Sequence, residues 1–173
     1  FNELGTLKLV ADSDPSRAEV FGDEFSVPVC LPEEAVKAEG IQAVVIATTA
    51  EEHFPLAKTA LMSGKDVYVE KPLTLTSEEA QELCAIAKRM KSVLMVGHIL
   101  KYHPSFNALL EVIKRGEIGE ILYVQSVRHG LGRVRRKEDV LWDFAPHDLS
   151  MILEVVGEIP VSIAARSEER RVG

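Results

Sequence analysis

A lysine that directly follows an apolar, β-branched run is the first residue whose type and place suggest chemistry. Lys71 stands after the run at 67–69, between Glu70 and Pro72. At the carboxyl end of a buried parallel strand, this lysine would lie in the crevice where open α/β sheets bind their ligands. Pro72 biases Lys71 towards an extended backbone, and Glu70 can hold or polarise the ammonium group. The alternative is an ordinary Glu–Lys pair on the surface at a strand end.

An aspartate occupies a comparable place nearer the start of the chain. Asp12 follows the apolar run at 7–11. In dinucleotide-binding folds an acid at the end of the second strand hydrogen-bonds the adenosine ribose hydroxyls, and its charge repels a 2′-phosphate. Asp12 therefore favours NAD over NADP, although the guanidinium of nearby Arg17 could accommodate that phosphate. The alternative is an aspartate that makes a turn or a helix cap.

A third strand end carries small and polar residues. Ala47 ends the apolar run at 43–47, Thr48 and Thr49 follow it, and His53 comes four residues later. Where a strand passes into a helix, backbone N–H groups face a bound ligand, so these residues are candidates for cofactor contacts. The alternatives are small residues that end any buried strand, and a histidine that caps a helix or lies on the surface.

The glycine fingerprint of a dinucleotide-binding domain, G-x-G-x-x-G/A, is not found in the chain. Gly130 and Gly132 come closest, but Arg135 stands in the third glycine's place and the segment reads as a loop. Either the domain does not bind a dinucleotide, or the chain begins after the first strand and first helix of the fold. The first residue, Phe1, is not methionine, which favours the second explanation.

A parallel sheet is needed to bring these strand ends together. Apolar runs without alternation predict strands buried on both faces, at residues 7–11, 43–47, 67–69 and 93–96. Apolar spacing predicts helices at 15–21, 33–37, 54–63 and from Thr76 onward, with Asp14 and Thr76 as N-caps and Glu79 completing a capping box. This alternation predicts a doubly wound α/β domain of the Rossmann type over residues 1–98.

After residue 98 the pattern changes. We expect a helix from Pro104 to about residue 115, a strand at 121–128 and a polar loop at 129–139. A helix at 147–156 and a strand at 159–165 complete the start of an α+β domain over residues 99–165. Residues 166–173 break the apolar pattern, and their DNA would resemble a common sequencing-library adapter. We expect this tail to be non-native rather than a solvated loop.

Composition and charge narrow the class of protein. With 46% hydrophobic and 27% charged residues among 173, the chain suits a packed domain and excludes a disordered tail, a collagen-like rod or a disulfide-stapled miniprotein. A net charge of −7 disfavours nucleic acid or an anionic membrane as partner. No apolar run approaches the ~20 residues that span a bilayer. Without a visible signal peptide, Cys30 and Cys84 predict two buried thiols in a cytoplasmic protein.

The segment 64–72, G-K-D-V-Y-V-E-K-P, resembles the G-K-x-V-x-x-E-K-P signature of the Gfo/Idh/MocA family (glucose–fructose oxidoreductase, inositol dehydrogenase, rhizopine catabolism). Similar motifs extend in the family's order up to Ala165: V-A-D at 10–12, V-I-A-T at 45–48, His53, and D-F-A-P-H-D at 143–148. Thr49 and Ala50 replace the usual Pro and Asn, and Lys101 stands where arginine is common. The wording W-D-F-A-P-H-D is similar to that of members acting on sugar nucleotides.

The resemblance implies a Rossmann domain that binds NAD or NADP, followed by a substrate domain through which the family usually forms homo-oligomers. It implies oxidation of a secondary alcohol on a cyclic polyol, sugar or sugar nucleotide, with no nucleic-acid or membrane partner. The implied catalytic residues are Lys71, Asp143 and His147. The implied cofactor-binding residues are Asp12, Ala47, Thr48, Thr49, His53, Glu70, Lys71 and Pro72.

In the implied reaction His147 is the base, because the free pKa of histidine, about 6.5, lies near operating pH. Lys71 stabilises negative charge that develops on the substrate oxygen. Asp143, one helical turn before His147, binds a substrate hydroxyl or orients the imidazole; its alternative is a helix N-cap. Two rival functions are a catalytically silent dinucleotide-binding regulator and a metal-dependent hydrolase built on His98, His103, Asp143 and His147.

Overall fold

The structure is a computed structural model, and it describes residues 2–128 and 140–166. The predicted loop at 129–139 and residues 167–173 of the predicted tail at 166–173 lie outside the described residues. The chain divides into two compact units, Phe1–His98 and Ile99–Gly173. No helix in the described part of the chain is both long enough and apolar enough to cross a membrane.

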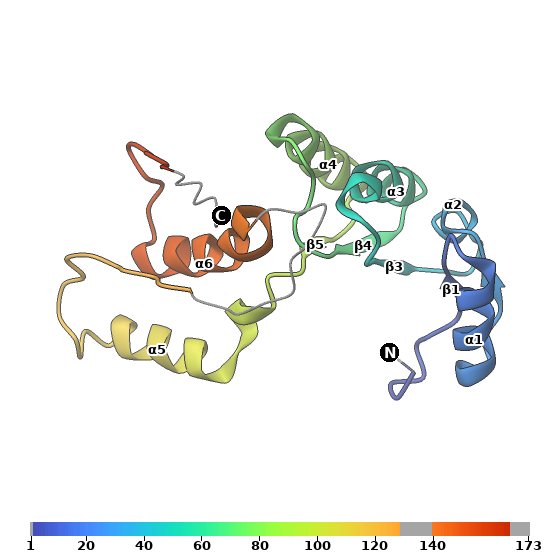
Figure 1. Cartoon of the computed structure of the whole chain (residues 1–173), viewed down its shortest axis with the longest axis horizontal. Helices are drawn as coiled ribbons and strands as arrows, with labels where there is room; N and C mark the ends of the chain where they lie inside the picture. Colours follow the sequence, from blue (N-terminus) through green and yellow to red (C-terminus); the bar gives the residue numbers. More distant parts are fainter. Residues whose placement is uncertain (1, 129–139, 167–173) are drawn as a thin grey trace, which may run out of the picture. The chain divides into compact units, whose positions relative to one another are not determined.

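The first unit alternates strands and helices, as predicted (Figure 1). Its elements in chain order are β1 (Val10–Ala11), α1 (Pro15–Phe25), β2 (Val29–Cys30), α2 (Pro32–Ala35), β3 (Ala43–Ile46), α3 (Ala50–Met62), β4 (Asp66–Val69), α4 (Ser77–Met90) and β5 (Leu94–Val96). The short strand β2 was not predicted, because two residues are too few to show an apolar pattern. Helix α3 begins four residues before the predicted start at residue 54.

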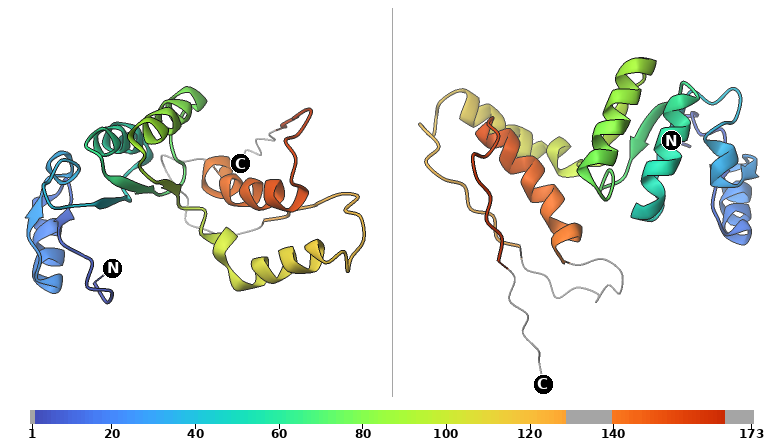
Figure 2. Two further views of the ribbon diagram at one scale, coloured as in Figure 1. Left: turned by 180° about the vertical axis from the view of Figure 1, so that it is seen from behind. Right: turned by 90° about the horizontal axis from the view of Figure 1, so that it is seen from above.

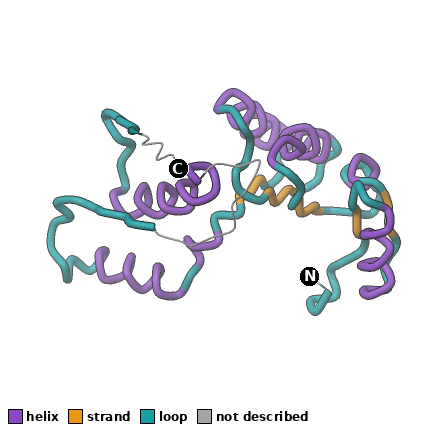
Figure 3. The backbone as a smooth tube through the Cα atoms, in the orientation of Figure 1, coloured by secondary structure: helices purple, strands orange, loops and turns teal. Residues whose placement is uncertain are grey.

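The strands form two parallel sheets, one with β1 and β2 and one in the order β3-β4-β5. Figure 3 shows how short these strands are beside the helices. Among the described strands, no ladder joins β1 to β3. The strand order of a doubly wound sheet is 3-2-1-4-5-6. Without strand 1, such a sheet would divide into one pair, strands 2 and 3, and a separate sheet that begins with strand 4. In this chain β1 and β3 would then correspond to strands 2 and 4, the two neighbours of the missing strand.

Helices α3 and α4 lie side by side and cover one face of the three-stranded sheet (Figure 1, Figure 2). Between them lies the hydrophobic core, made of Val36, Ile46, Leu56, Ala57, Ala60, Leu61, Val67, Val69, Leu83, Ile86 and Ala87. The prediction that the strands are buried on both faces is wrong for the described residues: Val45, whose side chain lies on the other face of β3, is 48% exposed. The reason is that α3 and α4 both pack on the face of Ile46 and Val69.

The predicted helix starts of α1 and α4 are confirmed. The Asp14 carboxylate accepts from the backbone N–H of Ser16 at 3.0 Å, and the Thr76 hydroxyl accepts from that of Glu79 at 3.3 Å. These contacts satisfy N–H groups that have no partner within the first turn of a helix.

The prediction of two buried thiols is wrong. Cys84 is exposed and Cys30 is partly buried, and both are free. On α4 the buried side chains are Leu83, Ile86 and Ala87. Cys84 lies about 100° around the helix from Leu83, which places it beside the buried stripe rather than within it.

The second unit contains η1 (Ile99–Tyr102), α5 (Pro104–Lys114) and α6 (Val140–Val156). Helix α5 matches its prediction, whereas α6 begins seven residues before the predicted start at 147. The ammonium group of Lys101 in η1 pairs with Glu154 of α6 at 2.7 Å, which joins these two elements.

The strands predicted at 121–128 and 159–165 are not formed. A strand requires hydrogen bonds to a neighbouring strand, and no described residue of this unit supplies that partner. Apolar side chains in these segments remain exposed, including Leu122 at 84% and Ile163 at 85%. The segments at 121–128 and 159–165 therefore have the apolar pattern of strands but lack the pairing that a sheet requires.

Candidate active site and cofactor edge

The registers of β3, β4 and β5 bring three chain segments to one edge of the sheet. Ile46 lies opposite Val69, and Val69 lies opposite Val96. The residues that follow these positions therefore leave the sheet at the same carboxyl edge. Backbone hydrogen bonds from Glu70 to Ile46 (2.9 Å) and from Gly97 to Val69 (2.8 Å) extend the ladders to this edge. It is the edge at which open α/β sheets bind ligands.

Glu70 is held by two hydrogen bonds beside Lys71. The Tyr68 hydroxyl donates to one carboxylate oxygen at 3.0 Å, and the backbone N–H of Lys71 donates to the other at 3.3 Å. Glu70 therefore contacts the backbone of Lys71, and its expected action on the Lys71 ammonium stays a prediction. The carboxylate acts on the path of the chain at Lys71.

Gly97 leaves room for this arrangement. A Cβ atom at residue 97 would lie 2.7 Å from the Tyr68 hydroxyl and 2.8 Å from a carboxylate oxygen of Glu70. Sequence reasoning missed both Tyr68 and Gly97. The signal for Tyr68 was available, because residues two apart on a strand share a face and Tyr68 stands two before Glu70.

Lys71 itself is partly buried, and its peptide bond to Pro72 is cis. Thr48 and Thr49, at the end of β3, are exposed, as is Ala47. Thr49 is the N-cap of α3 and makes no side-chain capping hydrogen bond. The exposed loop at 47–49 and the start of a helix therefore lie on the same edge as Lys71.

His53 is buried, whereas a residue that faces a ligand would be accessible. Its side chain is 1% exposed. The ring nitrogen Nδ1 lies 2.6 Å from the Pro72 carbonyl oxygen, and Nε2 lies 3.2 Å from that of Thr48. Neither a helix cap nor a surface histidine describes it, because it is enclosed within α3 with backbone carbonyls at both ring nitrogens.

Asp12 lies at the carboxyl end of the other sheet, after β1. One of its carboxylate oxygens accepts from the backbone N–H of Asp14 at 2.9 Å, and the other lies 3.6 Å from the Arg17 guanidinium. Asp12 thus forms the turn that we considered as its alternative role. Its side chain keeps 25% exposure, which leaves the carboxylate within reach of a ligand.

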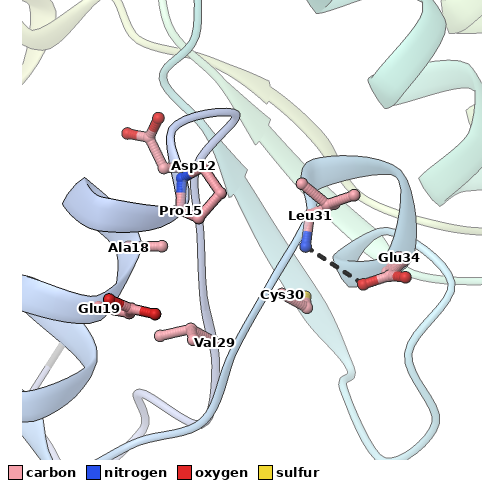
Figure 4. A pocket seen from close by; sticks show the side chains of 8 residues that line it. All are labelled: Asp12, Pro15, Ala18, Glu19, Val29, Cys30, Leu31 and Glu34. Carbon is pink, nitrogen blue, oxygen red and sulfur yellow. Dashed lines mark hydrogen bonds between the residues drawn. The ribbon is translucent and has the colours of Figure 1, made fainter.

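A cavity of about 290 Å³ opens beside Asp12, between α1, β2 and α2 (Figure 4). Its lining is mainly apolar, with carboxylates at Asp12, Glu19 and Glu34; the lining residues are Asp12, Pro15, Ala18, Glu19, Val29, Cys30, Leu31 and Glu34. Burial raises the pKa of the Cys30 thiol, and the negative charge of Glu34 raises it further. An apolar cavity with a partly exposed carboxylate suits a flat, uncharged ring joined to a hydroxyl-bearing sugar.

In the second unit, α6 carries Asp143 and His147 one helical turn apart, so the N-cap alternative for Asp143 is excluded. The side chain of Asp143 lies outside the described residues. His147 is partly buried, and its neighbour Asp148 binds the guanidinium of Arg128 through two hydrogen bonds of 2.8 and 3.0 Å. Hydrogen bonding to Arg128 lowers the pKa of Asp148. These hydrogen bonds connect the segment at 121–128 to α6.

The structure brings together part of the predicted site. Thr48, His53, Glu70, Lys71 and Pro72 gather at one sheet edge, whereas Asp12 belongs to the other sheet of the same unit and Asp143 and His147 to the second unit. Among the described residues, no three His, Cys, Asp or Glu side chains are grouped closely enough to hold a metal ion.

Comparisons with known proteins identify the family. The model of the Gfo/Idh/MocA family, an oxidoreductase family with an NAD-binding Rossmann fold, matches residues 2–98. Inositol 2-dehydrogenase from Rhizobium meliloti (strain 1021) is 30% identical over 95% of this chain and 51% of its own length. UDP-N-acetylglucosamine 3-dehydrogenase from Acidithiobacillus ferrooxidans is 31% identical over 94% of this chain and 50% of its own length.

Among solved structures, a candidate myo-inositol dehydrogenase from Sinorhizobium meliloti 1021 superposes with a TM-score of 0.76 at 29% identity, over 90% of this chain and 49% of that one. The chain thus spans about half the length of the curated relatives it matches. The family match covers the strands that carry Asp12, Thr48 and Lys71, so the fold and the motifs lead to one conclusion. The chain belongs to the Gfo/Idh/MocA family of oxidoreductases.

Proposed function

We propose that this chain is part of an NAD-dependent dehydrogenase that acts on a secondary alcohol of a cyclic polyol, a sugar or a sugar nucleotide. The observation that carries the proposal is the position of Lys71 at the carboxyl edge of β4, in a loop whose backbone is fixed by Glu70. An ammonium group at that edge can stabilise negative charge on a substrate oxygen. The names of the inositol and UDP-N-acetylglucosamine dehydrogenases support the substrate class.

The residues of the first unit fit a nicotinamide dinucleotide. The cavity beside Asp12 has apolar walls for an adenine and a carboxylate for the ribose hydroxyls. The loop at 47–49, together with Glu70, Lys71 and Pro72, would hold the nicotinamide half, with His53 acting from behind the loop. The cofactor, when bound, supplies the acceptor or donor for a hydride. We favour NAD over NADP for two reasons. The Asp12 carboxylate would repel a 2′-phosphate, and the Arg17 guanidinium, which could otherwise accommodate that phosphate, already pairs with the Asp12 carboxylate.

A segment outside this sequence completes the cofactor site in our proposal. The absence of a ladder between β1 and β3 among the described strands supports a further strand between them. In a doubly wound fold that strand leads into the glycine-rich turn for the pyrophosphate. We propose that a strand and glycine loop preceding Phe1 occupy this place, and that residues 1–98 form the dinucleotide-binding domain.

In the proposed reaction His147 accepts the proton of the substrate hydroxyl, because an imidazole can take up a proton near neutral pH. Lys71 stabilises the oxygen from which that proton leaves. Asp143, one turn from His147 on α6, binds a neighbouring hydroxyl or orients the imidazole. Residues 99–165 begin the substrate domain, and we propose a homo-oligomer formed through that domain. Two free thiols agree with a reducing, cytoplasmic location.

The test is turnover and cofactor affinity of Lys71→Ala and His147→Ala in the full-length protein, with inositols, sugars and UDP-sugars as substrates. We expect kcat to fall by about 10²–10³-fold for each variant, while the Kd of NAD from titration calorimetry changes little. Unchanged kcat in either variant would remove that residue from the mechanism. Tight NAD binding without turnover on any substrate would favour the silent regulator instead.

A further inference from the structure

We propose that His53 is a positioning residue that fixes the Lys71 loop against the end of β3. This inference rests on the proposed function only where it assigns Lys71 a role in turnover. The geometry points to His53 because it is among the few polar side chains buried in the described part of the chain. A polar group without water must find its hydrogen bonds inside the protein.

The two partners of His53 belong to two different loops. The β3–β4 ladder extends to the hydrogen bond from the Glu70 N–H to the Ile46 carbonyl. Beyond that bond, His53 contacts the carbonyl oxygens of Thr48 and Pro72, at 3.2 and 2.6 Å. A side chain from α3 therefore continues the connection between the strand ends past the point where the backbone ladder stops.

Lys71 lies between two such fixed points. On one side the Glu70 carboxylate accepts its backbone N–H and is itself held by Tyr68. On the other side the carbonyl of Pro72 is held by the His53 ring. Fixing the backbone on both sides limits where the Lys71 ammonium can go. Catalytic groups need this, because a misplacement of about 1 Å can cost about 10²-fold in rate.

The distances also assign the donor on the ring. Both partners are carbonyl oxygens, which only accept hydrogen bonds, and the shorter contact is the one from Nδ1 to Pro72. We place an N–H on Nδ1, where it donates to the Pro72 carbonyl beside Lys71. An asparagine at this position would carry its amide N–H near the place of Nδ1, whereas the longer glutamine would reach towards the place of Nε2.

Lys65 provides a matched control. It is 5% exposed, and its ammonium group donates to the carbonyls of Ala38 and Ile41 at 2.6 and 2.8 Å. It precedes β4, and Ile41 precedes β3, so these contacts lie at the amino ends of the same strands. Like His53, Lys65 is a buried side chain that contacts two backbone carbonyls, but it does so at the end of the sheet away from Lys71.

The experiment compares His53→Leu, His53→Gln, His53→Asn and Lys65→Met in the full-length protein. We expect His53→Leu to lower kcat by about 10–10²-fold with less than about threefold change in the KM for NAD. His53→Asn should restore most of kcat and His53→Gln less, whereas Lys65→Met should leave kcat near wild type. Native-state hydrogen exchange should show faster exchange at the Glu70 and Gly97 amides in His53→Leu but not in Lys65→Met.

Three results would overturn the proposal: an equal loss of kcat in His53→Leu and Lys65→Met, a loss of NAD affinity with kcat unchanged, or unaltered exchange at Glu70 and Gly97. If His53→Leu does not fold, the order of Asn and Gln decides, and Gln equal to or better than Asn rejects the assignment. Absence of dehydrogenase activity in the wild-type protein would reject the proposed function alone. The exchange data would still test whether His53 fixes the Lys71 loop against the end of β3.

Discussion

The carboxyl ends of β4 and β1 occupy equivalent places in parallel sheets, yet the structure stabilises them in different ways. The loop at Lys71 is fixed from inside, by a histidine that is 1% exposed and by a carboxylate packed against Gly97. The turn at Asp12 is fixed from outside, by its own backbone and by an arginine whose side chain is 63% exposed. Exposed ion pairs contribute little to stability. The Asp12 turn therefore depends mostly on the hydrogen bond from the Asp14 backbone N–H to the Asp12 carboxylate.

This difference agrees with the roles that we propose. A group that acts on a reacting atom must be held within a fraction of an ångström, and buried hydrogen bonds provide that precision. A group that recognises ribose hydroxyls needs only the right charge in an accessible place. The four predictions below are ordered by expected effect, and each sets one region against the other.

The largest effect should come from the core under the Lys71 edge. Leu61 on α3 is fully buried, whereas Val20 on α1 is 63% exposed. We expect Leu61→Ala to lower the free energy of unfolding by about 2–5 kcal/mol, because it leaves a cavity. Val20→Ala should change it by about 0.5 kcal/mol or less. Urea denaturation measures both, and comparable losses would show that the two regions are equally packed.

An added methyl group should then separate the two regions by activity. Gly97→Ala would place Cβ 2.7 Å from the Tyr68 hydroxyl, and we expect kcat to fall about tenfold with a stability cost of about 1–3 kcal/mol. Removing the Tyr68 hydroxyl in a Gly97→Ala, Tyr68→Phe double variant should recover part of the stability but not the placement of Glu70. Steady-state kinetics and thermal unfolding provide the two readouts.

Gly22 on α1 is the control for that prediction. A Cβ there would lie 2.4 Å from Val29 Cγ1, and Val29 lines the cavity beside Asp12. Gly22→Ala should therefore reduce stability and NAD affinity with kcat at saturating NAD unchanged. A tenfold loss of kcat in Gly22→Ala would contradict the division of roles between the two edges.

A smaller effect is expected from the charge of Asp12. Asp12→Asn keeps a side-chain oxygen for the Asp14 N–H, so the turn should survive. We expect the Kd of NAD to rise about tenfold, equivalent to about 1.4 kcal/mol, with kcat unchanged and with weaker discrimination against NADP. Titration calorimetry with both cofactors measures this. An unchanged preference for NAD would assign the discrimination to another residue.

The smallest effect concerns the thiols. Because burial and Glu34 raise the pKa of Cys30, less of it is thiolate near neutral pH, and it should react several-fold more slowly with iodoacetamide than exposed Cys84. Cys30 lines the cavity beside Asp12, so NAD should slow its alkylation further and leave Cys84 unaffected. Mass spectrometry of the alkylated peptides follows both sites. Protection of Cys84 alone would place the cofactor elsewhere.

Much of the site was predictable because it depends on short stretches of sequence. A buried run followed by a charged residue placed Asp12 and Lys71 at the ends of strands, and both lie there. Asp14 and Thr76 cap the predicted helices, because a cap is a contact between residues two or three apart. The strand–helix alternation similarly predicted that β3, β4 and β5 pair in parallel.

The tertiary structure decided the features that require a distant partner. The apolar segments at 121–128 and 159–165 are not strands, because pairing depends on a neighbour and not on composition. His53 was predicted as a cofactor contact, and the structure shows it buried between two loops. The sequence pattern could not indicate this, because its partner Pro72 is 19 residues away. Gly97 and Glu70 meet only because β4 and β5 lie side by side. Local chemistry selects the residues, and long-range packing, which no short pattern encodes, determines what each one contacts.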